Sequence, residues 1–284
     1  MKVVFFGSSK YVLPVIQVLK DNFDLALVIT TEQDLTGAIP SFCLKNNIPY
    51  LSVSNLSDPN LKSKLLNLKS DLAVLADFGL IIPNKILSLF PKGIINLHPS
   101  LLPKYRGPSP VQAAILNDDK KTGISIIKLD EKVDHGPILF QKEENVSEKE
   151  TAEDIHTKLF KVGSEHLYQA IKQYTDKLVL TPQDDSKATF TGLLKKGDGF
   201  IDFDNPPPAE RIKRMIRAYF PWPGVWFRCH SEQSEESQLD NKVIKLLPNE
   251  KIQVEGKKPM SYKDFENGYS EGKEILNKIN LIPN

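Results

Sequence analysis

The chain has 284 residues, with 37 lysines and arginines against 36 acids and a formal net charge of +1. This length suits one large domain plus a smaller one, and the balanced charge excludes nucleic-acid binding by bulk charge. The two cysteines, Cys43 and Cys229, are too far apart for a disulfide framework or a Cys-x-x-Cys metal pair, and no apolar run is long enough for a signal peptide or membrane span.

The first part of the chain predicts an open, mostly parallel α/β sheet with helices on both faces. Short apolar runs that read as buried strands alternate with stretches of helical pattern. The strands are expected at 3–6, 24–31, 71–75 and 93–97, and the helices at 11–20, 37–46 and 58–68. The first strand–helix turn has the single glycine Gly7, so the three-glycine dinucleotide fingerprint is absent and a nicotinamide site is disfavoured.

Three polar side chains mark the candidate site. Asn96 and His98 end the strand at 93–97 and point to the same face, because side chains on a strand alternate. Pro99 ends the strand, so the pair lies at a carboxyl end, where open α/β sheets place their sites. Asp134 lies in the loop after a further predicted strand at 123–129. An amide, an imidazole and a carboxylate can therefore meet over one cleft.

Each of these groups suits one task in direct attack by a substrate nucleophile on a carbonyl carbon. Asn96 can donate to a developing oxyanion, His98 can move a proton near neutral pH, and Asp134 can orient the imidazole. No Gly-x-Ser-x-Gly elbow surrounds Ser100. Spacing alone favours plainer roles for the three residues, which are a turn cap, a loop histidine and the start of a turn.

The remainder of the chain predicts a long helix at 151–174, a break at Pro206–Pro208 and a compact helix at 209–219. The compact helix has an apolar face and four cations against the single acid Glu210. A basic helix is often merely solvated, but this excess also fits a phosphate-binding surface. Its cations are Arg211, Lys213, Arg214 and Arg217.

The run Asn-Leu-His-Pro-Ser-Leu-Leu-Pro-Lys-Tyr-Arg-Gly-Pro-Ser-Pro at 96–110, followed by Asp134, resembles the signature of the methionyl-tRNA formyltransferases. Arg217-Ala218 and the Pro-Trp-Pro run at 221–223 resemble the opening of that family's C-terminal domain. The resemblance implies transfer of a formyl group from 10-formyltetrahydrofolate to the amino group of methionyl initiator tRNA. It implies a Rossmann-like catalytic domain over 1–180, a linker over 181–205, a shortened OB-like β domain over 206–272 and a tail over 273–284.

The resemblance also assigns residues. Asn96, His98 and Asp134 would be catalytic, and the basic helix at 209–219 would bind tRNA. Lys104 and Arg106 fit a phosphate or folate-tail contact as well as a solvated turn. No metal is implied, and we expect a monomer of the cytoplasm without membrane contact. The residues that would line the folate site are Ser100, Leu101, Leu102, Pro103, Phe78, Gly79, Leu80 and Ile81.

Two departures from the family leave the acceptor open. Glu32-Gln33-Asp34 stands where the family has a longer basic loop, and the polar stretch 230–238 interrupts the C-terminal domain. Sugar N-formyltransferases, which use the same trio, are therefore the main alternative. Glycinamide ribonucleotide formyltransferases are disfavoured by the unit that begins at Pro206, and a non-catalytic folate- or RNA-binding protein by the intact trio.

Overall fold

The computed structural model describes residues 1–31, 37–177, 180–229, 239 and 241–281. Its contacts divide the chain into two compact units. The first contains residues 1–110, 121–145 and 156–192, and the second contains 111–120, 146–155 and the chain from Leu193 onward. The predicted domain boundaries at 180, 205 and 272 stay predictions.

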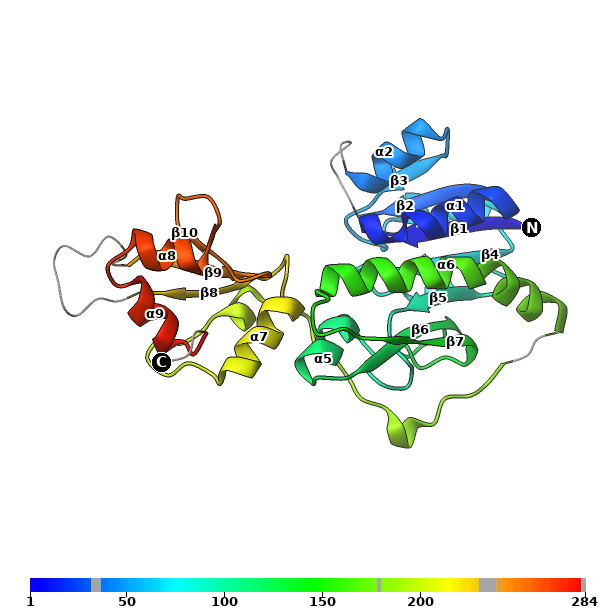
Figure 1. Ribbon diagram of the computed structural model, residues 1–284. Helices are drawn as coiled ribbons and strands as arrows, with labels where there is room; N and C mark the ends of the chain where they lie inside the picture. Colours follow the sequence, from blue (N-terminus) through cyan, green and yellow to red (C-terminus); the bar gives the residue numbers. More distant parts are fainter. Residues whose placement is uncertain (32–36, 178–179, 230–238, 240, 282–284) are drawn as a thin grey trace. The chain divides into compact units, whose positions relative to one another are not determined.

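The first unit is built on a seven-stranded sheet of order β3-β2-β1-β4-β5-β6-β7 (Figure 1). Every pairing from β3 to β5 is parallel, and the pairings of β6 with β5 and β7 are antiparallel. The predicted mostly parallel sheet is thus confirmed. The strands are β1 (Lys2–Gly7), β2 (Asp24–Thr30), β3 (Tyr50–Ser52), β4 (Leu72–Ala76), β5 (Ile94–His98), β6 (Lys121–Lys128) and β7 (Ile138–Asn145).

Strand order explains why both faces of the sheet are covered. From β1 the chain adds β2 and β3 on one side, and it then returns to add β4 and β5 on the other side of β1. Because each crossover between parallel strands is right-handed, the helices that connect strands on the two sides of β1 cover opposite faces of the sheet. Phe6 of β1 packs in one core cluster with Leu61 and Leu65 of α3. The helices that end or begin in this unit are α1 (Leu13–Asn22), α2 (Ala38–Lys45), α3 (Pro59–Leu68), α4 (Asn84–Leu87), α5 (Pro110–Leu116) and α6 (Ala152–Lys177).

Helix α6 lies against the sheet where the site is built (Figure 1). A Cβ placed on Gly163 would lie 3.1 Å from the Leu97 side chain and 3.0 Å from that of Ile124. The glycine therefore lets the helix approach β5 and β6 closely, and it supports the strand that carries Asn96 and His98.

Two predicted elements differ from the observed ones. The helix predicted at 11–20 runs as α1 from Leu13 to Asn22 after a short 3-10 turn, Lys10–Val12, because Pro14 occupies its first turn. The strand that the sequence predicts at 136–143 runs as β7 from Ile138 to Asn145. Its last residues are polar, which an edge strand with one partner allows.

The second unit contains a small antiparallel sheet of order β11-β10-β9-β8, so the predicted C-terminal β unit is confirmed. In the described part of the unit these strands form a meander, and Ile201 N–H donates to the carbonyl of Trp226 on β8. The elements are α7 (Ala209–Ala218), β8 (Val225–Arg228), β9 (Val243–Leu247), β10 (Lys251–Val254), β11 (Met260–Ser261), α8 (Tyr262–Gly268) and α9 (Gly272–Lys278).

Two sequence-based interpretations concern residues outside this description. The acidic loop at 32–34 and the polar stretch at 230–238 lie outside the described residues. Along the described chain, no helix combines the length and apolarity that crossing a membrane requires.

Candidate active site

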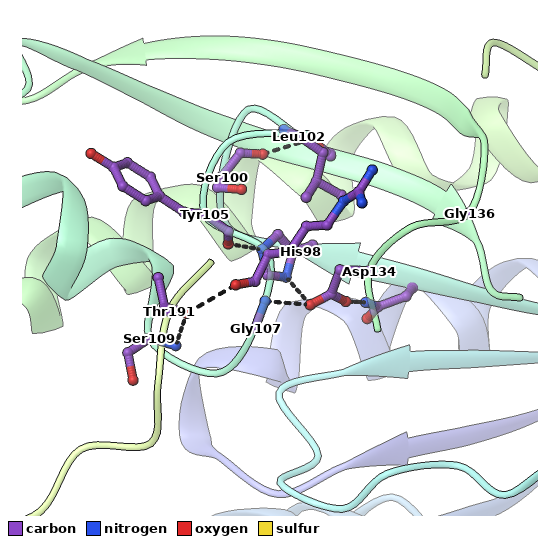
Figure 2. A network of polar contacts seen from close by, with 12 residues as sticks. His98, Ser100, Leu102, Tyr105, Gly107, Ser109, Asp134, Gly136 and Thr191 are labelled. Atoms are coloured by element: carbon purple, nitrogen blue, oxygen red, sulfur yellow. Dashed lines mark hydrogen bonds and ion pairs between the residues drawn. The ribbon is translucent and has the colours of Figure 1, made fainter. Parts of the chain in front are cut away.

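The structure brings the three candidate catalytic side chains together. Asn96 and His98 are buried on β5, and Asp134 lies in the loop between β6 and β7. The Asn96 Nδ2 donates to Asp134 Oδ1 at 3.1 Å, and Oδ2 lies 3.5 Å from His98 Nδ1. Figure 2 shows the imidazole and the carboxylate facing each other. The amide, the imidazole and the carboxylate therefore form one contiguous polar site.

Hydrogen bonding fixes the state of the imidazole. His98 Nε2 lies 2.9 Å from the Tyr105 carbonyl (Figure 2). A carbonyl oxygen only accepts, so Nε2 carries a proton. Nδ1 then faces Asp134 Oδ2 at 3.5 Å, the distance of an ion pair when the ring is protonated. Both ring nitrogens are therefore directed at protein atoms.

Backbone conformations that few residues adopt shape both loops of the site. Asp134 has a φ of 48°, and its carboxylate Oδ2 also accepts from Gly107 N–H at 2.8 Å. Gly107 has a φ of 106°, which a side chain would strain. At Gly136 an added Cβ would overlap the Lys128 carbonyl at 1.8 Å. These two glycines let the loops come close enough for the Asp134 contacts.

In the predicted folate-lining run from Ser100 to Pro103, two residues are buried and two are partly exposed. Ser100 and Leu102 are buried, and the Ser125 hydroxyl donates to the Ser100 carbonyl at 2.6 Å and accepts from Leu102 N–H. Gln141 donates to the same hydroxyl and to the Leu102 carbonyl. Leu101 and Pro103 are half-buried and can contact a ligand. Ser125 lies inside an apolar strand, so its sequence gave no signal of this role.

The second predicted folate-lining run, Phe78 to Ile81, follows β4. Phe78 is buried, and its ring packs edge-on against Phe6 at 5.4 Å. Leu80 packs against the same core cluster, whereas Ile81 is 82% exposed. Gly79, with a φ of 80°, turns the chain between them. The folate-binding role of this run stays a prediction, and the groups available for it are the backbone and Ile81.

Arg106 is a structural residue rather than an exposed cation. It is 4% exposed, and its guanidinium donates to Gln183 Oε1 and to Asp185 Oδ1. The same Asp185 carboxylate pairs with His135 Nε2 at 3.2 Å. Hydrogen bonds from Arg106 and then from His135 lower the pKa of Asp185. Arg106 is therefore not part of a solvated turn, and its contact with a phosphate or the folate tail stays a prediction.

A cavity of about 320 Å³ opens beside this network, and its lining includes Val133 and His135, the residues on either side of Asp134. Val133 and Phe190 supply its apolar surface and are 53% and 72% exposed. The Arg106 guanidinium lies 6.0 Å from the Phe190 ring centroid. The residues that line the cavity include Arg106, Lys132, Val133, His135, Asp185 and Phe190.

His156 on α6 is a neighbour of the site that the sequence did not mark. Its ring stacks on Tyr11 at 5.3 Å, and its buried Nδ1 has no hydrogen-bond partner among the described residues. Burial lowers its pKa, the charge of His98 lowers it further, and Asp77 raises it. His156 is therefore a neutral ring at neutral pH, close enough to His98 to sense its charge.

The basic residues predicted to bind tRNA belong to helix α7 and differ in their contacts. Arg211 Nη1 donates to the Leu116 carbonyl, and Arg217 Nη1 donates to the carbonyls of Ser147 and Glu150. Arg214 Nη1 lies 3.9 Å from Asp118. Lys213 is exposed and pairs with Glu210. The tRNA-binding role of these residues stays a prediction, and Lys213 is the one exposed cation of the four.

Comparison with known proteins agrees with this geometry. Residues 1–171 match the model of the family described as Formyl transferase, and residues 193–249 match Formyl transferase, C-terminal domain. A methionyl-tRNA formyltransferase of Roseiflexus castenholzii is 33% identical over 94% of this chain and 96% of its own length. One of Treponema denticola is 34% identical over 94% of this chain and 97% of its own.

The chain belongs to the methionyl-tRNA formyltransferase family. Its resemblance to that family in the run 96–110 is thereby confirmed, and so is its nature as a formyltransferase.

Solved structures show how far the fold is shared. A phosphoribosylglycinamide formyltransferase from Bacillus Halodurans is 26% identical, with a TM-score of 0.55 over 63% of this chain and 97% of its own. A 4-N formyltransferase from Francisella tularensis is 21% identical, with a TM-score of 0.64 over 81% of this chain and 93% of its own. The second likeness concerns the fold alone.

The described residues contain no group of three histidine, cysteine, aspartate or glutamate side chains arranged to bind a metal ion.

Proposed function

We propose that the protein transfers the formyl group of 10-formyltetrahydrofolate to the α-amino group of methionyl initiator tRNA in the cytoplasm, and that it acts as a monomer. The observation that carries the proposal is the contact of Asn96 with Asp134, with His98 beside it, in a chain whose full-length relatives are named methionyl-tRNA formyltransferases. The donor and the acceptor are substrates, and the protein supplies hydrogen bonds, charge and a path for one proton.

The reaction needs a neutral amine at the formyl carbon. A model α-amine has a pKa of about 7.7–8.0, so a sizeable fraction is already neutral near neutral pH. The amine nitrogen forms a bond to the formyl carbon, the bond from that carbon to N10 of the donor breaks, and one proton passes from the amine to N10. No oxidant or further reactant is required.

Asn96 stabilises the oxyanion in this scheme. One Nδ2 hydrogen is donated to Asp134 Oδ1, and the amide has a second hydrogen on the same nitrogen for the developing charge. An amide donor does not titrate, so this contribution does not depend on pH. The neighbouring carboxylate fixes the orientation of the amide before the substrate binds.

Asp134 and His98 carry the proton. Asp134 Oδ2 and His98 Nδ1 lie 3.5 Å apart, which places a carboxylate and an imidazole together next to Asn96. The Tyr105 carbonyl fixes the ring through Nε2–H, so the imidazole cannot rotate away. When the ring is cationic, its charge lies close to the oxyanion position and adds to the stabilisation by Asn96.

An assay with two acceptors identifies the substrate. The purified protein is given 10-formyltetrahydrofolate and either charged initiator Met-tRNA or a nucleotide-linked amino sugar. Formyl-methionyl-tRNA as product, with an unreacted sugar, is the expected result. Sugar formylation with unreacted tRNA would assign the chain to the sugar branch instead. Failure of both acceptors with intact donor would contradict formyl transfer by this site.

A further inference from the structure

The segment that follows α6 is part of the catalytic site rather than a simple connection. Thr181 pairs with Ile138 of β7 through two backbone hydrogen bonds, of 2.8 and 2.9 Å. Further along, the Thr189 carbonyl accepts from Arg106 N–H, and Thr191 N–H donates to the Arg106 carbonyl. Residues 181–191 therefore run along both loops that shape the site, the one at 103–109 and the one at 134–136.

The Gln183 side chain joins these two loops through backbone carbonyls of the 134–136 loop and the guanidinium of Arg106. Its Nε2 donates to the Asp134 carbonyl at 2.8 Å and to the Gly136 carbonyl at 2.7 Å. Its Oε1 accepts from Nε and Nη2 of Arg106, at 3.1 and 2.8 Å. Both amide hydrogens and the amide oxygen are thus used. A fully paired amide in one orientation is a rigid link between its partners.

The partners of this link are adjacent to the catalytic contacts. Asp134 has the uncommon φ of 48°, so its backbone requires support from its surroundings. Arg106 stands between Tyr105, whose carbonyl accepts from His98, and Gly107, whose N–H donates to Asp134 Oδ2. Gln183 therefore connects the main chain of the catalytic carboxylate to the loop that orients both the carboxylate and the imidazole.

We propose that Gln183 is a positioning residue for formyl transfer, which sets the distance of the Asp134 carboxylate from Asn96 and His98. The inference rests on the proposed function for its activity readout. A displacement of a reacting group by about 1 Å can reduce a rate by about 100-fold. Loss of the two donors to the 134–136 loop is expected to produce such a displacement without removing any group that touches substrate.

The decisive variant is Gln183→Glu. It keeps an oxygen for Arg106 but replaces the two N–H donors with a carboxylate oxygen directed at two carbonyls. Gln183→Met, of similar length, removes both sets of hydrogen bonds. Ser186→Ala is the matched control, because this exposed residue lies on the same segment and its hydroxyl donates to Asp184 rather than to either loop.

We expect kcat of Gln183→Glu to fall by about 10- to 100-fold, with KM for both substrates within about twofold of wild type. Ser186→Ala should behave as wild type. A kcat loss that disappears at a lower temperature, in step with a lower melting temperature, would mean a purely structural role and would overturn the proposal. So would an unchanged kcat in Gln183→Glu while wild type turns over methionyl-tRNA.

A crystal structure of each variant separates this inference from the proposed function, since it needs no acceptor. In Gln183→Glu the Asp134 carboxylate should move away from Asn96 Nδ2, whereas in Ser186→Ala the distance should stay near 3.1 Å. An unmoved Asp134 in Gln183→Glu would overturn the positioning role, whichever acceptor the enzyme uses.

Discussion

Asn96 and Asp134 meet through one hydrogen bond of 3.1 Å from Nδ2 to Oδ1, although one lies on the inner strand β5 and the other in the loop before β7. This contact orients the amide whose second hydrogen is available to an oxyanion. Asn96→Ala should therefore reduce kcat by about 100- to 1,000-fold, as loss of one oxyanion donor does elsewhere. The measurement is steady-state formylation, with the melting temperature as a check of folding. A variant that keeps wild-type kcat would exclude Asn96 as the oxyanion donor.

Gly107→Ala tests the loop geometry that supplies an N–H to Asp134. A Cβ on Gly107 would lie 2.6 Å from the Thr191 carbonyl, and the residue has a φ of 106°. We expect the free energy of unfolding to fall by about 1–3 kcal/mol and kcat to fall by at least about 10-fold. Gly197→Ala is the control, since nothing lies within 4 Å of its added Cβ. Equal kinetics of the two variants would show that the Gly107 contact is dispensable.

His156→Phe tests the buried imidazole on α6 through the pH dependence of stability. The pKa of His156 is lower in the folded protein than its ordinary value of about 6.5, chiefly because of burial. The unfolded chain then binds more protons as the pH falls below about 6.5, so the folded state loses stability from there down to the folded pKa and has its full stability above 6.5.

Urea unfolding of wild type and His156→Phe at pH 7.5 and 5.5 measures this effect. Phenylalanine keeps a flat ring against Tyr11 and Phe160 and cannot titrate. The loss of stability between the two pH values should be smaller in the variant. An identical loss in both proteins would mean that His156 does not contribute to the acid sensitivity.

The sequence predicted most of the sheet because its strands depend on local pattern and chain order, whereas the resemblance to the family identified the trio. Strand alternation places Asn96 and His98 on one face, but β6 runs antiparallel to β5, so a shared carboxyl edge does not account for their contact with Asp134. The contact between Arg106 and Gln183 could not be predicted, because it joins segments far apart in the chain, which neither periodicity nor motif spacing encodes. The Gln183 side chain lies in a stretch whose composition is typical of a linker.

Charge alone did not show which cations of α7 have partners within the protein. Four cations on one helix fit a phosphate-binding face, and in the structure Arg217 is half-buried and donates to the Ser147 and Glu150 carbonyls. Burial lowers the pKa of its guanidinium. The side chain links α7 to residues 147–150 of the same unit. The pattern of a helix gives the sign of its charges but not which of them are already paired.

Helix α7 therefore predicts two separable phenotypes. Arg217→Ala should lower the free energy of unfolding by about 1–2 kcal/mol, because charged donors to backbone carbonyls are lost. Lys213→Glu should change the free energy of unfolding by less than about 1 kcal/mol, since Lys213 and Glu210 form an exposed ion pair. If Lys213 contacts the tRNA backbone, this variant should bind tRNA more weakly and with a shallower salt dependence. Unchanged tRNA binding in Lys213→Glu would remove that residue from the nucleic-acid surface.

The central claim is that Asp134, oriented by Asn96 and His98, carries formyl transfer to methionyl-tRNA. Single-turnover formylation with enzyme in excess, comparing wild type with Asp134→Asn, tests it most directly because product release and substrate binding are removed from the rate. The asparagine variant keeps the size of the side chain and cannot take up a proton. The account predicts rapid formation of formyl-methionyl-tRNA by wild type and a rate at least about 100-fold lower in the variant. A variant that formylates at the wild-type rate would contradict it.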